Sequence, residues 1–307
     1  MSTLPRVTAV IATIGRPELL RRAVRSLLAQ DYPGEVEVIV SYDHIAIDPL
    51  EDVAVPAGRT LRTVANQHRQ GLAGGRNTGA QLGTGELIGF CDDDDEWLPG
   101  KLDAQVRLWR EHPEAAAVSC SVLLRSDGRD HRMLAPARTE FEDLLRDRVA
   151  ALHSTSTIYR REDLLPGGAI GPFDEELPAS YGEDYDFLLR TARTGPILSV
   201  TAPLVRVLWD RPSFFARRWE NMAAGLTYLL RKFPEFESSP RGLARIAGQV
   251  AFCHAAAGHR GRARTWARAA LRRDPRQLRA WAALVVAAGV ISGETLVRWV
   301  EKTGKGL

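Results

Sequence analysis

The chain of 307 residues is long enough for one large domain or two ordinary ones, and 45% hydrophobic and 26% charged residues exclude a disordered or fibrous protein. Its longest uncharged apolar run, residues 280–291, is too short for a membrane-spanning helix, and three widely separated cysteines exclude a disulfide framework or a CxxC metal motif. Residues 241–307 carry 13 lysines and arginines against three acids, a net of +10, which leaves −7 for residues 1–240 within the whole-chain +3. No signal peptide is recognisable, so we expect a cytoplasmic protein.

The first ninety residues alternate between two patterns, apolar runs typical of buried strands and amphipathic stretches typical of helices. Pro17 opens the first helix pattern. We expect strands at residues 7–13, 36–41, 61–65 and 86–91, and helices at 17–29 and, after a glycine-rich loop, 77–82. Strands that alternate with helices predict a mostly parallel sheet covered on both faces.

Beyond Trp97 the pattern is mixed, and from residue 214 onwards it is entirely helical. The mixed region predicts helices at 99–111, 141–147 and 185–194, strands at 116–124 and 154–159, and a polar turn at 127–130. We expect a boundary near residues 210–240, between an acidic α/β body and a basic helical tail.

Four aspartates, Asp92–Asp95, follow the expected strand at 86–91 without a spacer. Ligands of open α/β sheets bind at the carboxyl ends of the strands, and adjacent carboxylates repel unless a cation lies between them. Oxygen ligands suit Mg²⁺ or Mn²⁺, which proteins often share with substrate phosphates. The alternative is a solvated acidic loop that caps the helix near Pro99.

Four segments in this order carry a resemblance: VTAVIATIGRPELLRRAVRSLLAQ, VEVIVSYD, GLAGGRNTGAQLGTGELIGFCDDDDEWLPGKL and GPFDEELPASYGEDYDFLLRTARTG. Together they resemble a family 2 glycosyltransferase with the GT-A fold, over about residues 5–210. The resemblance implies a GT-A domain at 1–210, with a nucleotide-sugar half at about 1–98 and an acceptor half at about 99–210. Residues 211–307 would form a basic helical extension.

The resemblance implies a divalent cation, Mn²⁺ or Mg²⁺, as cofactor. In such enzymes an Asp-x-Asp motif places one aspartate near the ribose or sugar, here Asp92, and one on the metal that bridges the donor diphosphate, here Asp94. Asp93 is the next choice for the metal and otherwise belongs to the nucleotide site.

The resemblance also implies a nucleotide site at the ends of the first strands. Ala12 and Thr13 would line the nucleotide, Asp43 would accept a hydrogen bond from the base, and Arg76 would contact base or phosphate oxygens. Uridine is favoured and thymidine is second, although Tyr42 stands where the family usually has a further aspartate. For Asp43 the alternative is an ordinary turn residue after a strand.

The general base implied by the resemblance is Asp184, which opens the expected helix at 185–194. It would take the proton of the acceptor hydroxyl during a single displacement with inversion at the anomeric carbon. Glu183 and Asp186 are the alternatives, and an ordinary helix cap would explain the same acidic residues.

Some members of the family carry a metal-proximal histidine after the last strand, where this chain has residues 205–211 without one. Asp210 or a water is the expected substitute, and Arg206 or Arg211 would neutralise the diphosphate. The lone His153 is interpreted as structural, with an acceptor contact as the alternative.

The basic tail has a weak tetratricopeptide-like spacing of small residues, Gly and Pro over residues 244–277. Ten arginines between 241 and 279 face one acid there, Asp274. Three interpretations stay open: contact with anionic lipid headgroups, docking on the acidic body of another copy, or a compositional bias without function. No nucleic-acid partner is expected, because no known reading motif accompanies the charge.

The residues thus favour a metal-dependent inverting glycosyltransferase that uses a nucleotide-diphosphate sugar. The acceptor hydroxyl would belong to a glycan, a lipid-linked sugar or a small natural product. One alternative is a nucleotidyltransferase built on a similar sheet. That reaction favours a glycine-rich loop with Arg and Lys after the first strand, and this chain has no such loop there. The other alternative is a catalytically silent scaffold that acts through the basic tail. Hydrolysis of a donor sugar by the protein would exclude this alternative.

Overall fold

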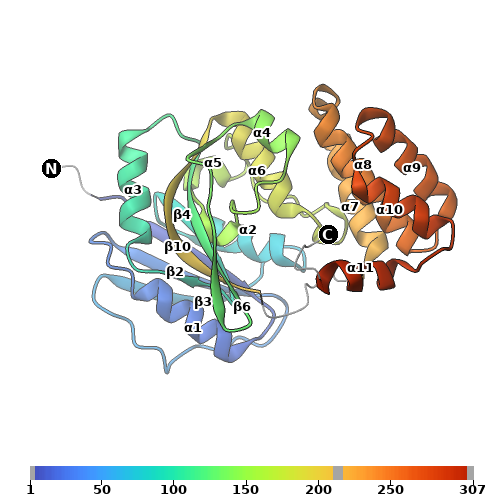
Figure 1. Ribbon diagram of the computed structural model, residues 1–307. Coiled ribbons are helices and arrows are strands. Elements are labelled where there is room, and N and C mark those ends of the chain that lie inside the picture. The colour runs from blue at the N-terminus through green and yellow to red at the C-terminus, as the bar shows by residue number, and fades with distance from the viewer. Residues whose placement is uncertain (1–3, 210–216, 303–307) are drawn as a thin grey trace. The chain divides into compact units, whose positions relative to one another are not determined.

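The computed structural model of the protein describes residues 4–209 and 217–302, with side chains described up to residue 299. The chain divides into two compact units (Figure 1). The first contains the chain up to residue 141 together with residues 149–175 and 183–211. The second contains the remainder of the chain from residue 212, with two short segments, 142–148 and 176–182.

The first unit is built on one mixed sheet with the strand order β3-β2-β1-β4-β9-β6-β10-β5, to which β7 and β8 add as partners of β6 and β10. The strands are β1 (Val7–Thr13), β2 (Val36–Tyr42), β3 (Arg59–Ala65), β4 (Leu87–Asp92), β5 (Glu96–Trp97), β6 (Ala117–Ser126), β7 (Arg129–Met133), β8 (Arg138–Thr139), β9 (Ile158–Arg160) and β10 (Ile197–Leu208). Most paired residues lie in the parallel ladders of β1–β2, β2–β3, β1–β4 and β6–β10. The predicted α/β class with a mostly parallel sheet is therefore confirmed.

The helices of the first unit are α1 (Pro17–Leu28), α2 (Leu72–Leu82), α3 (Lys101–Glu111), α5 (Arg161–Leu164) and α6 (Glu183–Thr194), with a 3-10 turn at Ser154–Ser156. Phe141 begins the short helix α4 (Phe141–Arg146), whose remaining residues belong to the second unit. The order β3-β2-β1-β4 means that the chain moves outwards from β1 and then returns to its other side. This reversal places the carboxyl ends of β1 and β4 at the topological switch point, where open α/β sheets bind ligands.

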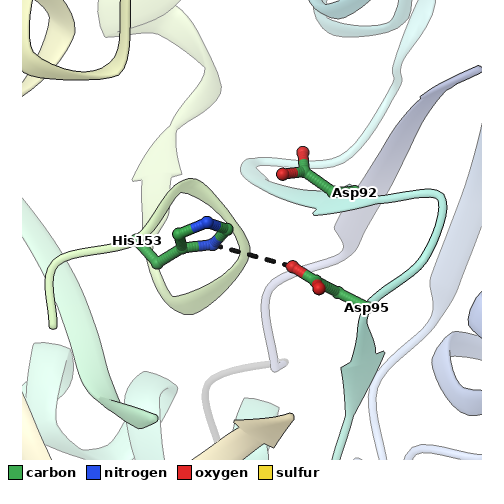
Figure 2. Close-up of side chains that lie close together, drawn as sticks. All are labelled: Asp92, Asp95 and His153. Atoms are coloured by element: carbon green, nitrogen blue, oxygen red, sulfur yellow. Dashed lines mark ion pairs between the residues drawn. The ribbon is translucent and has the colours of Figure 1, made fainter. Parts of the chain in front are cut away.

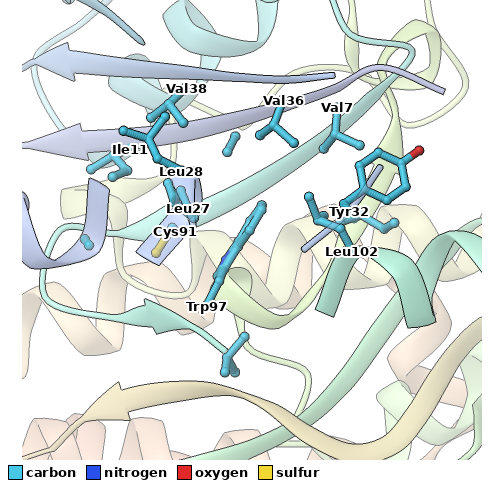
Figure 3. Packing of buried hydrophobic residues seen from close by; sticks show 14 of the residues in the cluster. Val7, Ile11, Leu27, Leu28, Tyr32, Val36, Val38, Cys91, Trp97 and Leu102 are labelled. Atoms are coloured by element: carbon cyan, nitrogen blue, oxygen red, sulfur yellow. The ribbon is translucent and has the colours of Figure 1, made fainter. Parts of the chain in front are cut away.

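The core on one face of the sheet is formed by β1, β2 and β4 with α1 and α3 (Figure 3). Every residue of β1 and β2 is buried, as the predicted continuous apolar runs require. On α1 the buried residues recur at helical spacing: Leu20, Ala23, Val24, Leu27 and Leu28. Trp97 fills the centre of this cluster and is 2% exposed.

The glycine-rich segment predicted as a loop is instead the first half of α2, which begins at Leu72. Its glycines allow the helix to approach β1 closely. A Cβ at Gly75 would lie 2.7 Å from the Cβ of Ala12, and one at Gly79 would lie 2.2 Å from Cγ1 of Val10. Tertiary packing thus outweighs the low helix propensity of glycine here.

The polar turn expected at 127–130 is confirmed as the tip of a hairpin between β6 and β7. The strand expected at 154–159 is short and begins only at Ile158, because a 3-10 turn precedes it. A strand not expected, β10, runs through Pro203, where the ladder with β6 shifts register and thereby tolerates a residue without an N–H.

Lys101 is a buried cation in this core, and we expect the Lys101→Met variant to be more stable than the wild type at neutral pH. The Nζ atom lies 3.8 Å from the centre of the Trp97 ring and donates to Oε1 of Gln105 over 2.8 Å. Burial lowers the pKa of Lys101 to about 8. Below that pH the folded protein must charge a buried amine, which costs about 3 kcal/mol relative to an unfolded lysine.

The two contacts of the ammonium offset part of that cost, so we expect a net gain of about 1–2 kcal/mol at pH 7 for Lys101→Met. Because the folded pKa is below the unfolded value of 10.5, wild-type stability should rise between pH 8 and pH 10.5, and the variant should lose this rise. Urea denaturation across this pH range measures both effects, with Lys232→Met as the control for loss of a lysine. Equal pH profiles of wild type and variant would contradict the assignment.

The second unit is helical, as predicted for the region beyond residue 214, within the residues that the structure describes. Its helices are α7 (Trp219–Lys232), α8 (Pro240–Ala256), α9 (Arg260–Arg273), α10 (Leu278–Ala287) and α11 (Gly293–Lys302), with a 3-10 turn at Pro234–Ser238. Buried alanines dominate the contacts among α8, α9 and α10. No helix of the described chain is long and apolar enough to cross a membrane.

Candidate active site

The predicted nucleotide residues meet at the carboxyl ends of β1, β2 and β4. Ala12 is paired with Asp92 across the β1–β4 ladder, and Thr13 is paired with Tyr42 across the β1–β2 ladder. Asp43 follows β2 directly, and its backbone N–H donates to the carbonyl of Thr13 over 2.9 Å. Residues that are distant in the sequence therefore share one edge of the sheet.

Asp43 is buried and organises the loop between β3 and α2. Its Oδ1 accepts from the side-chain amide of Asn66 over 2.8 Å, and its Oδ2 accepts from the backbone N–H of Gly71 over 2.9 Å. Gly71 has a φ of 129°, which a residue with a side chain rarely adopts. Recognition of the base by Asp43 stays a prediction, and its present contacts also fit the alternative of a turn-forming aspartate.

The four aspartates form a tight turn, which Asp95 fixes to two other parts of the first unit. Thr155 Oγ1 donates to Asp95 Oδ2 over 2.5 Å, and the backbone N–H of Leu208 donates to Oδ1 over 3.2 Å. His153 Nδ1 lies 3.7 Å from Oδ2 of the same carboxylate (Figure 2). Asp92, Asp95 and His153 offer ligand atoms that all lie within 4.8 Å of one another, close enough for a metal ion.

Asp93 and Asp94 share one cationic partner, Arg16, which directly precedes α1. Its Nη2 pairs with Oδ1 of Asp93, and its Nη1 pairs with Oδ2 of Asp94. Thr13 Oγ1 donates to the other oxygen of Asp93 over 2.6 Å. The Asp93 side chain is 2% exposed whereas that of Asp94 is 19% exposed, so Asp94 is the more accessible of the two.

Arg76 of α2 connects the aspartate turn to the start of α6. Its guanidinium donates to Oδ1 of Asp92 over 2.6 Å, to Oε1 of Glu183 over 2.8 Å and to Oγ of Ser154 over 3.0 Å. The side chain is only 3% exposed. A direct contact of Arg76 with a nucleotide stays a prediction, and its position indicates a buried brace between the two acidic segments.

Helix α6 begins at Glu183 and is held in place by stacked aromatic rings. The rings of Phe173 and Phe187 are stacked with centroids 3.9 Å apart, and Tyr159 and Phe90 pack edge-on against this pair. Asp184 is half-buried and lines a cavity together with Ser154 and Phe173. The expected base therefore lies at the start of a helix that aromatic packing holds in place, beside a small cavity.

The pKa values of the buried carboxyls differ because their charged partners differ. Burial raises the pKa of Glu183 to about 7, although Arg76 opposes the shift. Burial also raises the pKa of Asp93 against the opposing effects of Thr13 and Arg16. For Asp92 burial acts in the same direction, but Arg76, with smaller help from His153, outweighs it and holds the pKa below its usual range. Arg76 thus keeps Asp92 ionised in a half-buried position.

Three residues of this site had no specific sequence signal. In the sequence Asp95 is one of four equivalent aspartates, His153 is a lone histidine, and Arg16 is one of many arginines. Each lies far in sequence from its partner, so a single sequence gives no spacing by which to pair them. Asp210, the expected substitute for a metal-proximal histidine, and Arg211 lie outside the described residues. Arg206 pairs with Glu96 over 3.1 Å.

Comparison with known proteins identifies a family for this fold and site. The family model described as "Glycosyl transferase family 2" matches residues 8–165, just over half of the chain. A Campylobacter jejuni GalNAc(5)-diNAcBac-PP-undecaprenol beta-1,3-glucosyltransferase is 31% identical over 111 residues, which cover 35% of this chain and 36% of that protein. The Escherichia coli UDP-Glc:alpha-D-GlcNAc-diphosphoundecaprenol beta-1,3-glucosyltransferase WfgD is 21% identical over 141 residues, 46% of this chain and 55% of that protein. The chain thus matches between about a third and just over half of the length of these relatives.

Solved structures with the GT-A fold align with nearly the whole chain and confirm the predicted fold class. S. aureus TarS 1-349 in complex with UDP-GlcNAc aligns with a TM-score of 0.60 at 17% identity, over 98% of this chain and 92% of that one. The mannosyltransferase PcManGT from Pyrobaculum calidifontis, in complex with GDP-Man and Mn²⁺, aligns with a TM-score of 0.53 at 22% identity, over 94% and 87% of the two chains. The family match includes the edge of the sheet and its aspartate turn, and it shows that the chain belongs to glycosyl transferase family 2.

Proposed function

We propose that this chain is a metal-dependent, inverting glycosyltransferase that transfers a sugar from a nucleotide-diphosphate donor to an acceptor hydroxyl. The observation that carries the proposal is the bridge made by Arg76, which holds Asp92 and Glu183 at 2.6 Å and 2.8 Å and so brings the donor-side aspartates and Asp184 to one site. Family membership supports the reaction class. The role of each residue is part of the proposal.

The acidic residues fit a divalent cation, because carboxylate oxygens are the ligands that Mg²⁺ and Mn²⁺ prefer. Asp94 would hold the ion, with Asp93 as the next choice, and the Asp92–Asp95–His153 group is a second set of donors. The guanidinium of Arg16 between Asp93 and Asp94 supports the fit, since positive charge is already stabilised there. When bound, such an ion would offset the negative charge of the diphosphate leaving group.

In the transfer step Asp184 would accept the proton of the acceptor hydroxyl. The acceptor oxygen forms a bond to the anomeric carbon while the bond from that carbon to the donor diphosphate breaks, which inverts the configuration. Arg76 and the aromatic rings under α6 would hold Asp184 in position, and Ala12 and Thr13 would line the nucleotide. Rigid placement of the base is what such a displacement requires.

We favour UDP as the nucleotide, with dTDP second, because Asp43 would read an edge that both bases share. The relative WfgD is named for UDP-Glc, and TarS was solved with UDP-GlcNAc, which supports the same choice. The two glucosyltransferases are named for undecaprenol-linked substrates, which favours a lipid-linked sugar over other acceptors.

Calorimetric titration with UDP, dTDP, GDP and CDP, each with and without Mn²⁺, tests the donor site. We expect UDP to bind most tightly, and Mn²⁺ to tighten its binding by about tenfold or more, in line with the loss typical when a metal site is disturbed. Asp94→Asn should lose the effect of Mn²⁺, whereas Asp103→Asn, an exposed aspartate on α3, should retain it. Absence of metal-dependent binding for all four nucleotides would refute the proposal.

A further inference from the structure

Helix α10 of the second unit is apolar on both of its faces, which is unusual for a helix at a protein surface. Its only charged residue is Arg279, and its inner face of small side chains is buried against α8 and α9. The opposite face lies in solvent: Leu278 is 80% exposed, Trp281 51% and Val285 42%. These three residues are spaced at i, i+3 and i+7 and therefore share one face of the helix.

A row of arginines lies on α9, the helix that packs beside α10. Arg264, Arg268 and Arg272 recur every fourth residue, so they follow one another along the helix, and all three are exposed. The side chain of Arg264 donates to the carbonyl of Ala287 at the end of α10 over 3.5 Å, which places this end of the row beside that helix. Among the described residues no carboxylate forms an ion pair with these three arginines.

We propose that this surface, defined by Arg264, Arg268 and Arg272 with Leu278, Trp281 and Val285, docks on the anionic surface of a phospholipid bilayer. Leu278, Trp281 and Val285 would enter the headgroup region, and the guanidinium groups would bind lipid phosphates. An apolar face beside a basic row is typical of segments that lie in a membrane interface, and tryptophan is common on the apolar face of such segments.

Charge favours a bilayer over a second copy of this chain docked through the same surface. A second copy of this chain docked through the same surface would bring two rows of unpaired arginines together, at a cost in repulsion. The residues from 241 to 307 carry a net charge of +10. An anionic bilayer presents many lipid phosphates, so several arginines can each bind one weakly at the same time. The proposal goes beyond the proposed sugar transfer and does not rest on it, because vesicle binding needs neither donor nor metal.

Co-sedimentation of the full chain with vesicles tests the proposal, using phosphatidylcholine alone and an equal mixture of phosphatidylcholine and phosphatidylglycerol. We expect binding to the mixed vesicles only, weakened by added salt. Arg268→Gln/Arg272→Gln should lower the partition coefficient by roughly twenty-five-fold, since each arginine near an anionic surface contributes about fivefold. Leu278→Ser/Val285→Ser should also lower it. Arg107→Gln/Arg129→Gln removes the same charge from exposed sites of the first unit and should leave binding within about twofold of the wild type.

Thermal melting shows whether each variant is folded, and nucleotide titration of the same variants separates this proposal from the proposed function. Failure of the wild type to bind mixed vesicles, or equal binding to both kinds of vesicle, would overturn the proposal. Equal loss in the Arg107→Gln/Arg129→Gln control would do the same, because the effect would then reflect net charge alone. If the wild type is an oligomer and Leu278→Ser/Val285→Ser is a monomer, the surface binds a second copy of the chain and the proposal is wrong.

Discussion

The Asp184→Asn variant is expected to lose sugar transfer, with kcat reduced by about a hundredfold to ten-thousandfold. Asparagine has nearly the same shape but cannot accept the acceptor's proton, so binding of the donor nucleotide should be retained. Its side-chain oxygen can still accept from the backbone N–H of Tyr185, which donates to Asp184 Oδ1 over 2.8 Å. Product formation under saturating donor and acceptor, together with calorimetric nucleotide binding, measures the two properties separately.

Glu183→Gln is the comparison that identifies the base. Its carbonyl oxygen can still accept from Arg76, so the brace is kept while the carboxylate is removed. If Asp184 is the base, Glu183→Gln should retain far more activity than Asp184→Asn. A larger loss in Glu183→Gln would move the assignment to Glu183, and full activity in Asp184→Asn would exclude Asp184.

The Arg76→Met variant is expected to lower the free energy of unfolding by about 3–5 kcal/mol, because it leaves two buried carboxylates without their shared cation. The side chains of Asp92 and Glu183 are 24% and 6% exposed, so water cannot replace the guanidinium fully. Chemical denaturation measures the loss. The exposed Arg107, which pairs with Asp103 on the same helix, gives the control: Arg107→Met should cost less than about 1 kcal/mol.

A second substitution separates the lost charge pairing from the lost packing of the arginine. Arg76→Met/Glu183→Gln removes one of the two stranded carboxylates and should recover about 1–2 kcal/mol relative to Arg76→Met. A double variant no more stable than Arg76→Met would mean that the arginine acts through packing, for example on the Phe173 ring 5.2 Å away. Stability of Arg76→Met within about 1 kcal/mol of the wild type would contradict the brace itself.

The parts of the fold that could be predicted are those determined by local patterns. Continuous runs of β-branched residues predicted β1 and β2 because both faces of these strands are covered, and the spacing of Leu20 to Leu28 predicted α1. The aspartate cluster could be placed at a strand end because it directly follows the apolar run at residues 86–91. The local prediction was wrong where the structure depends on packing between distant residues. The glycines of α2 predict a loop, but they are needed because the helix packs closely on Val10 and Ala12.

The site could be predicted only as separate segments. Asp92, Asp184 and Arg76 are each predictable from their own segments, but no local pattern places Arg76 between Asp92 and Glu183, a residue 107 positions away. His153 and Thr155 meet Asp95 across about sixty residues, and nothing in their neighbourhood marks them. Long-range pairing is set by topology, which a local pattern does not encode.

The position of β1 between β2 and β4 has a consequence for synthesis on the ribosome. The chain can begin the parallel ladder early, but β1 gains its second neighbour only when residues 87–92 are available. The aspartate turn is then fixed by Thr155 and by Leu208, much later in the sequence. The residues that anchor the acidic turn are therefore among the last of the first unit to be made, and we expect the turn to become ordered only when this unit folds as a whole. A chain released before β10 would lack the backbone N–H of Leu208 that holds Asp95.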